Sequence, residues 1–152
     1  MHEGGCFCDH VRYRMTAEPM FVTCCHCRDC QKLTGSAFAV NAMIESDRVE
    51  VTSVGQPVTA GDVDKDMRCP ECKVLLWATH RMYGDPVLFV RVGTLDRADL
   101  INPDAHFFVS RSHPWVTIPP DLPAFAELPG PDDPPLMSDK GRQRLAAAMG
   151  RG

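Results

Sequence analysis

Four cysteines and one histidine lie within a single stretch of seven residues. Such a density of soft ligand atoms is typical of a metal-binding loop. In extended backbone, residues i and i+2 share a face, so Cys25 and Cys27 point the same way and a following turn can bring Cys30 to them. Cys24 and His26 then face the opposite side. This predicts a small core residue at Cys24 and a hydrogen-bonded or solvated histidine at His26, rather than further ligands.

All eight cysteines lie between Cys6 and Cys72 and fall into groups of short spacing. The first residues carry no apolar export signal, so we expect a cytoplasmic protein whose thiols are kept reduced. Closely spaced cysteines in such a chain are typical of zinc thiolate ligands. Buried structural thiols and a redox pair are the alternatives, but small buried residues have no reason to occur together in such pairs.

Two of the cysteine motifs supply only two ligands each and cannot close a tetrahedral site alone. They are Cys6-x-Cys8, near the N-terminus, and Cys69-x-x-Cys72, which has the spacing of a zinc knuckle. Brought together across the fold, they predict a four-thiolate zinc site. Closed sites of this kind are structural and contribute directly to folding.

Cys25, Cys27 and Cys30 form a second group with three ligands and one open coordination position, which is the pattern of a catalytic metal site. The competing division joins Cys27 and Cys30 to the Cys69-x-x-Cys72 pair as a zinc ribbon. That division leaves Cys25 and the first cysteine pair without a fourth partner.

Three thiolates donate so much charge that a bound zinc ion becomes a weak Lewis acid toward water. A sulfur-rich site is better matched to a fourth sulfur ligand, such as the thiol of a substrate. Metal binding also deprotonates that thiol and holds it in place. The predicted chemistry is therefore that of thiols rather than hydrolysis.

The remaining sequence predicts a mainly β fold. Runs of β-branched and aromatic residues predict strands, and turn signals such as Gly61-Asp62 separate some of them. The predicted strands cover residues 11–15, 20–23, 37–44, 48–52, 74–80, 87–93 and 105–110. The segment from Asp29 to Leu33 is predicted to form one helical turn that ends at Gly35.

The domain boundary is expected near residue 128. Residues 1–128 are predicted to form a zinc-binding β domain, and residues 129–152 a proline-rich tail with a short terminal helix. Ser138 is the expected N-cap of a helix from Asp139 to Met149, which is short enough to need a docking partner.

Composition excludes several classes of function. The chain has 152 residues and a net charge of −4, without a basic stripe, which argues against nucleic-acid binding. Its apolar runs are too short to cross a membrane, so no membrane partner is expected.

The ordered motifs resemble the glutathione-dependent formaldehyde-activating enzyme family over roughly residues 3 to 128. The resemblance rests on residues 4–8, on residues 25–32 with Gly35, on residues 69–72 and on Val92-Gly93-Thr94-Leu95-Asp96, followed by Pro103, His106-Phe107 and Pro114-Trp115. It implies a zinc-stapled β-tent fold with two zinc ions per chain. One ion would be held by Cys6, Cys8, Cys69 and Cys72, and the functional ion by Cys25, Cys27 and Cys30.

The resemblance also implies an activity: glutathione adds to formaldehyde to give S-hydroxymethylglutathione, formally a carbon–sulfur lyase reaction in reverse. A small-molecule thiol and an aldehyde are the expected partners. Arg28 and Lys32, on the cysteine loop, are the expected cations for an acidic tripeptide. The alternatives left open are a non-catalytic zinc-binding interaction module and, for the assembly, a homodimer.

Three positions depart from the family pattern. Asp9 and Lys73 stand where glycine is usual, after the first cysteine pair and after the knuckle. Gln31 stands where arginine is usual, which removes one positive charge beside the predicted site.

Overall fold

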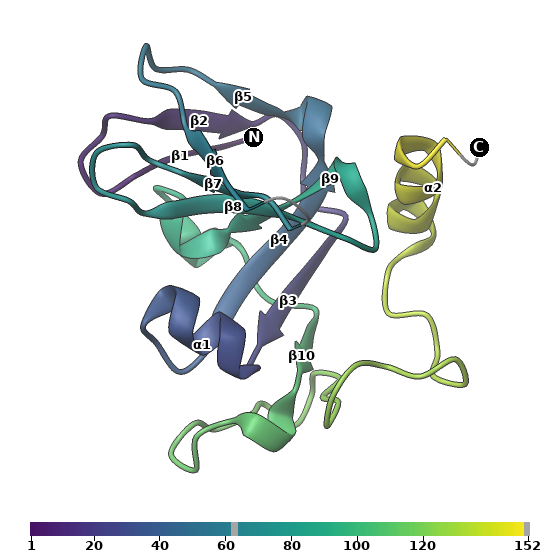
Figure 1. Ribbon diagram of the computed structural model, residues 1–152. Coiled ribbons are helices and arrows are strands. Elements are labelled where there is room, and N and C mark those ends of the chain that lie inside the picture. The colour runs from purple at the N-terminus through teal and green to yellow at the C-terminus, as the bar shows by residue number, and fades with distance from the viewer. Residues whose placement is uncertain (62–63, 151–152) are drawn as a thin grey trace.

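Ten strands in two sheets make up most of the fold, shown in Figure 1 for the computed structural model, in which residues 1–61 and 64–150 are described. The smaller sheet has the order β1 (His2–Gly5), β2 (Arg12–Met15) and β5 (Val49–Val51). The larger sheet has the order β10 (Ala105–Phe107), β3 (Phe21–Cys25), β4 (Ala39–Glu45), β9 (Gly84–Arg91), β8 (Leu75–His80), β7 (Asp66–Arg68) and β6 (Val58–Ala60). Neighbouring strands are antiparallel except for β10 and β3, which pair in parallel.

Within residues 1–61 and 64–150, helical structure is limited to two α-helices and four short 3-10 turns. The helices are α1 (Arg28–Thr34) and α2 (Asp139–Ala148), and the turns are η1 (Ser46–Arg48), η2 (Val92–Thr94), η3 (Ala98–Leu100) and η4 (Val109–Arg111). The prediction of a mainly β fold with short helical turns and a C-terminal helix is thereby confirmed. The second residue of the predicted turn at 61–62 and the last two residues of the predicted tail lie outside the described ranges.

The core lies between the two sheets, because apolar side chains from both face inward. Tyr13 of β2 is fully buried, and its ring meets Trp77 of β8 edge-on with 5.3 Å between centroids. Its hydroxyl lies 2.6 Å from the hydroxyl of Thr94, which satisfies the polar end of a buried ring. Met15 and Leu76 are fully buried in the same cluster. This packing fixes the orientation of the strands that carry the cysteines.

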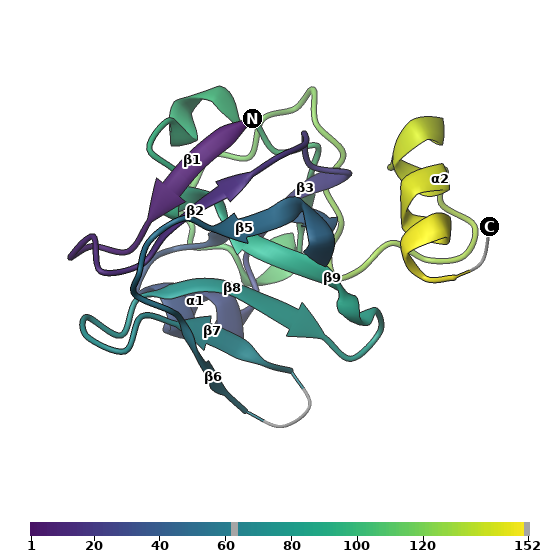
Figure 2. The same cartoon turned by 90° about the horizontal axis from the view of Figure 1, so that it is seen from above.

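Helix α2 stands beside the larger sheet, as Figures 1 and 2 show from two directions. Leu145 and Met149 pack with an apolar cluster that includes Met20 and Met43. The helix begins where the sequence predicts, with the Ser138 hydroxyl accepting the Gly141 N–H at 3.1 Å. The terminal segment is therefore docked on the β structure, while its division from residues 1–128 as a separate unit stays a prediction. In the described part of the chain, no helix has the length and apolarity needed to cross a membrane.

Candidate metal centres and substrate cavity

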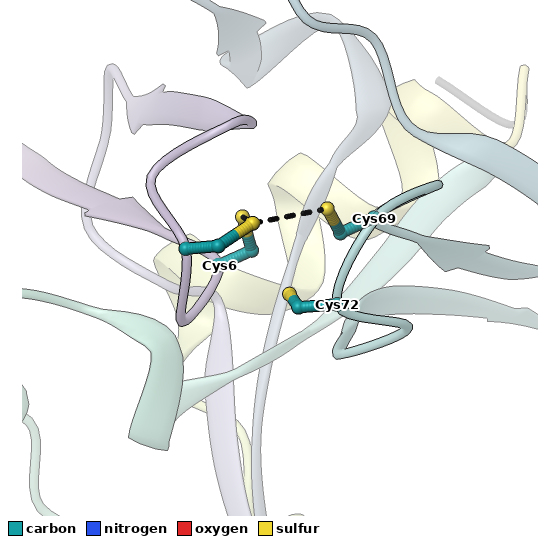
Figure 3. A group of neighbouring side chains, drawn as sticks. Cys6, Cys69 and Cys72 are labelled. Carbon is teal, nitrogen blue, oxygen red and sulfur yellow. Dashed lines mark hydrogen bonds between the residues drawn. The ribbon is translucent and has the colours of Figure 1, made fainter.

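The four-cysteine cluster consists of Cys6, Cys8, Cys69 and Cys72, whose sulfurs all lie within 4.8 Å of one another. Figure 3 shows the Cys6, Cys69 and Cys72 side chains converging from two separate loops. The Sγ atoms of Cys6 and Cys8 are 3.6 Å apart, and those of Cys8 and Cys69 are 3.8 Å apart. Donors this close, from positions far apart in sequence, could hold one metal ion.

Two tight turns present these sulfurs. Cys8 lies in a turn that follows β1. The chain reverses there with Asp9 in the left-handed region at φ 58°, and the second turn closes with Lys73 at φ 64°. Backbone N–H groups then point at sulfur: Val11 donates to Cys6 Sγ at 3.3 Å. Both departures from the family's glycines therefore fall at positions where the backbone favours glycine.

The thiols of this cluster do not titrate alike. Burial opposes ionisation of Cys72, but hydrogen bonds from the Val74 and Cys8 backbone and from neighbouring thiols lower the pKa of Cys72 to about 6. The His10 backbone favours the thiolate of Cys8, yet burial and the adjacent thiols raise the pKa of Cys8 to about 11. Neighbouring thiolates repel one another, so all four can ionise together only around a cation. The donor set therefore fits a soft divalent metal ion.

The three-cysteine group consists of Cys25, Cys27 and Cys30, whose sulfurs also lie within 4.8 Å of one another. Cys25 ends β3, and Cys27 is the N-cap of α1. The N–H of Cys30 donates to Cys27 Sγ at 3.4 Å, and the helix ends at Gly35 in the left-handed region. One strand end and one short helix thus bring the three sulfurs together, as alternation and a turn predict. Their role as ligands remains a prediction.

Two thiols of this group, Cys25 and Cys30, have pKa values shifted in opposite directions. The hydrogen bond with Cys25, together with Arg91, lowers the pKa of Cys30 to about 6, although burial opposes this. The same hydrogen bond, with burial, raises the pKa of Cys25. Thiolates this close repel one another, so a bound cation would allow more of these thiols to ionise.

A cavity of about 660 Å³ opens beside the three-cysteine group and includes all three of its residues in the lining. Four aromatic rings form much of the apolar wall: Tyr83, Phe89, Phe107 and Phe108. Phe108 adopts a left-handed backbone at φ 59°, which is unusual for a bulky side chain. The cavity is large enough for a small-molecule ligand of more than one functional group.

Several arginines line this cavity. Arg81 is paired with Asp64 at 3.0 Å, whereas Arg28, Arg91 and Arg111 form no ion pair with any described residue. Arg28 was predicted to contact substrate and does lie in the lining, but Lys32 lies outside it. Their assignment to substrate binding stays a prediction.

Gln31 forms buried hydrogen bonds that its position in the sequence did not predict. Its side chain is 5% exposed, and its amide donates to the carbonyls of His26 at 2.7 Å and Arg111 at 3.0 Å. Its carbonyl oxygen accepts a hydrogen bond from Arg28. Gln31 therefore ties the cysteine loop to the segment after β10 and holds one cavity arginine in place.

Cys24, His26 and His106 form a buried cluster on the opposite face of β3. His26 Nε2 lies 3.0 Å from His106 Nδ1 and 3.6 Å from Cys24 Sγ. Burial lowers the pKa of both histidines. These three donors could hold a metal ion, but the outer nitrogens of both rings have no hydrogen-bond partner in the described chain. Ligating histidines usually donate their second N–H, so a neutral hydrogen-bonded chain explains this cluster better.

Two polar side chains lie beside the three-cysteine group where sequence reasoning did not place them: Asn41 was not considered, and Arg91 was favoured as a solvated surface charge. They are direct partners in the register between β9 and β4, and both line the cavity. The available signal was an arginine directly after the apolar run Val87–Val90, but only strand pairing shows which residue stands opposite it.

The profile of the glutathione-dependent formaldehyde-activating enzymes matches residues 1–111. The chain belongs to this family. No curated protein matches the chain. A crystal structure of a Rhodobacter sphaeroides protein from a structural genomics programme is 17% identical, with a TM-score of 0.52, over 66% of this chain and 96% of that one. That similarity supports the fold alone. Residues 112–152, with α2, lie beyond the part that the family profile matches.

Proposed function

We propose that this member of the glutathione-dependent formaldehyde-activating enzyme family is a zinc-dependent carbon–sulfur lyase. In the synthetic direction it joins a small-molecule thiol to an aldehyde, with glutathione and formaldehyde as the reference pair. The observation that carries the proposal is the three-cysteine group opening onto a cavity lined by arginines that pair with no described acidic residue.

Both cysteine groups fit zinc, because each gathers three or four thiols that repel one another when ionised without a cation. The four-cysteine cluster would hold a structural ion, and the three-cysteine group would hold the functional one. Zinc bound at the second site would keep the substrate thiol in its thiolate form.

The chain's own residues then position the reactants. An acidic tripeptide offers carboxylates, and Arg28 and Arg111 offer guanidinium groups that no described acid occupies. The aromatic wall contributes apolar contact and keeps water away from the reacting sulfur. The presence of this cavity supports an enzyme rather than a non-catalytic zinc module.

The test combines metal quantification with calorimetric titration of glutathione. We expect two zinc ions per chain in the wild-type protein, and one ion with loss of glutathione binding in Cys27→Ser. Cys24→Ser is the matched control, because it alters the opposite face of the same strand and should keep both ions. A wild-type protein that binds glutathione no better than Cys27→Ser would contradict the proposal.

A further inference from the structure

Arg91 occupies the end of β9 directly beside the three-cysteine group. Its register partner on β4 is Asn41, and the Arg91 guanidinium donates a hydrogen bond to the Asn41 side-chain oxygen. Asn41 is only 7% exposed, so this anchor is itself held by the surrounding sheet. The guanidinium and Cys30 line the same cavity, and the positive charge of Arg91 helps to lower the pKa of the Cys30 thiol. Arg91 is therefore fixed in place at the point where the substrate sulfur is expected.

The guanidinium has hydrogen-bonding capacity that the protein does not use. Its Nε is buried and has no partner among the described residues. A buried N–H without an acceptor costs about 1–3 kcal/mol, so such groups call for an explanation, and a ligand that supplies the acceptor is one. No acidic residue in the described chain pairs with Arg91, so its positive charge is not used in a protein ion pair.

The other cavity arginines are less suited to the reacting centre. Arg81 is already paired with Asp64, and Arg28 donates to Gln31. Arg91 instead lines the cavity from the end of β9, and its charge lowers the pKa of Cys30 in the three-cysteine group.

The proposed reaction creates an anionic oxygen close to that sulfur. The thiolate sulfur forms a bond to the aldehyde carbon, and the carbonyl π electrons move onto the oxygen as an alkoxide. This oxygen then takes a proton from water to give the hydroxyl of the adduct. In the cleavage direction, the hydroxyl loses its proton, the C=O bond re-forms and the C–S electrons return to sulfur. Fixed donors aimed at such an oxygen typically contribute a factor of about 10²–10³ in rate.

We propose that Arg91, held by Asn41, donates a hydrogen bond to the aldehyde oxygen as negative charge develops on it during thiol addition. This assignment rests on the proposed function and names the group that serves as its oxyanion donor. Asn41 acts as a positioning residue, because it touches the guanidinium and not the reactants.

The first experiment measures adduct formation by Arg91→Met and Arg91→Lys with glutathione and formaldehyde. We expect kcat to fall about 100-fold or more in Arg91→Met, with zinc content and glutathione affinity within twofold of wild type. Arg91→Lys keeps the charge but lacks the planar donor array, so its kcat should fall by a smaller factor. Arg97→Met is the charge-matched control: Arg97 is exposed, pairs with Asp99 at 2.7 Å and lies outside the cavity lining.

A second readout does not depend on turnover. S-carboxymethylglutathione and S-methylglutathione differ only by a carboxylate on the sulfur-bound carbon, so their affinity ratio reports a group that recognises anionic oxygen there. We expect the wild-type protein to bind S-carboxymethylglutathione more tightly than S-methylglutathione. In Arg91→Met, the ratio of the two affinities should fall at least tenfold. Asn41→Ala should show a smaller loss with unchanged zinc content.

The possible outcomes distinguish failure of the Arg91 role from failure of the proposed lyase function. A wild-type protein without adduct activity overturns both. An active wild type with an equally active Arg91→Met overturns only the role of Arg91. Loss of zinc in Arg91→Met would mean that the guanidinium serves to balance the charge of the cysteine group, which also overturns the donor role.

Discussion

At the scale of single residues, backbone conformation explains two unusual positions next to the four-cysteine cluster. Asp9 and Lys73 hold left-handed φ angles where glycine would be free of strain. Aspartate tolerates this region better than most side chains, because its short side chain can hydrogen-bond to the neighbouring backbone. Lysine adopts it rarely, although the Lys73 ammonium here donates to the Pro70 carbonyl at the end of a long side chain. The turn that follows the knuckle is therefore the more strained of the two.

Lys73→Gly should raise the free energy of unfolding by about 0.5–1 kcal/mol, because relief of left-handed strain outweighs the added freedom of the unfolded chain. Chemical denaturation of the metal-loaded protein measures this change. Glu71→Gly, in the same turn but without a positive φ, is the control and should destabilise by a similar amount. Equal effects of the two substitutions would exclude strain at Lys73.

At the scale of elements, α2 is held to the sheet by both apolar packing and one largely buried ion pair. Arg144 on the helix contacts Glu45 at the end of β4 with two hydrogen bonds, at 2.7 and 2.5 Å. Burial raises the pKa of Glu45, but the Arg144 hydrogen bonds, the backbone and nearby charges together lower it below its ordinary value. The pair thus joins the C-terminal segment to the family part of the fold.

Arg144→Met should lower the free energy of unfolding at neutral pH by about 1–3 kcal/mol, since it leaves a buried carboxylate without its charged donor. The lowered pKa of Glu45 means that the stabilisation is complete above the unfolded-state pKa, roughly pH 4, and is lost as pH falls through the folded value. The difference between variant and wild type should therefore shrink in acid.

Denaturation curves across pH test the Arg144 prediction. Lys140→Met is the matched control, because Lys140 is exposed on the same helix and forms no ion pair within the described chain. It should change stability by less than about 0.5 kcal/mol. A pH-independent effect of Arg144→Met would assign its contribution to packing instead.

At the scale of the whole molecule, the two cysteine groups are attached to the fold in different ways. The four-cysteine cluster joins loops that are 61 residues apart, between Cys8 and Cys69, so it closes a long stretch of chain. The three-cysteine group lies within one strand end and one short helix. Closing a long loop restricts the unfolded chain, so only the first group should contribute strongly to global stability.

Chelation should therefore remove metal in two stages. We expect mild chelators to take the ion from the three-cysteine group, with its open position, while near-ultraviolet circular dichroism stays native. Removal of the second ion should lower Tm by about 10 °C or more. A simultaneous loss of both ions with unfolding would contradict separate structural and functional sites.

Residue types and spacing were enough to predict a strand-rich fold and a short helix that ends at Gly35. They were also enough to predict that the side chains of Cys25, Cys27 and Cys30 come together. These features are local: alternation along a strand and the reach of one turn depend only on neighbouring residues. The family resemblance was also readable, because its motifs are continuous segments.

The surroundings of the three-cysteine group could not be predicted from the sequence. In the sequence, Gln31 marks only the loss of a positive charge, whereas in the structure its buried amide donates to the Arg111 carbonyl. Lys32 lies outside the cavity lining. Arg91 lies in the lining, where its register partner is Asn41. The docking of α2 through Arg144 is another feature that the sequence alone did not predict. Each depends on strand register or on contacts between residues far apart in the chain, where packing of the whole molecule, not local spacing, selects the partners.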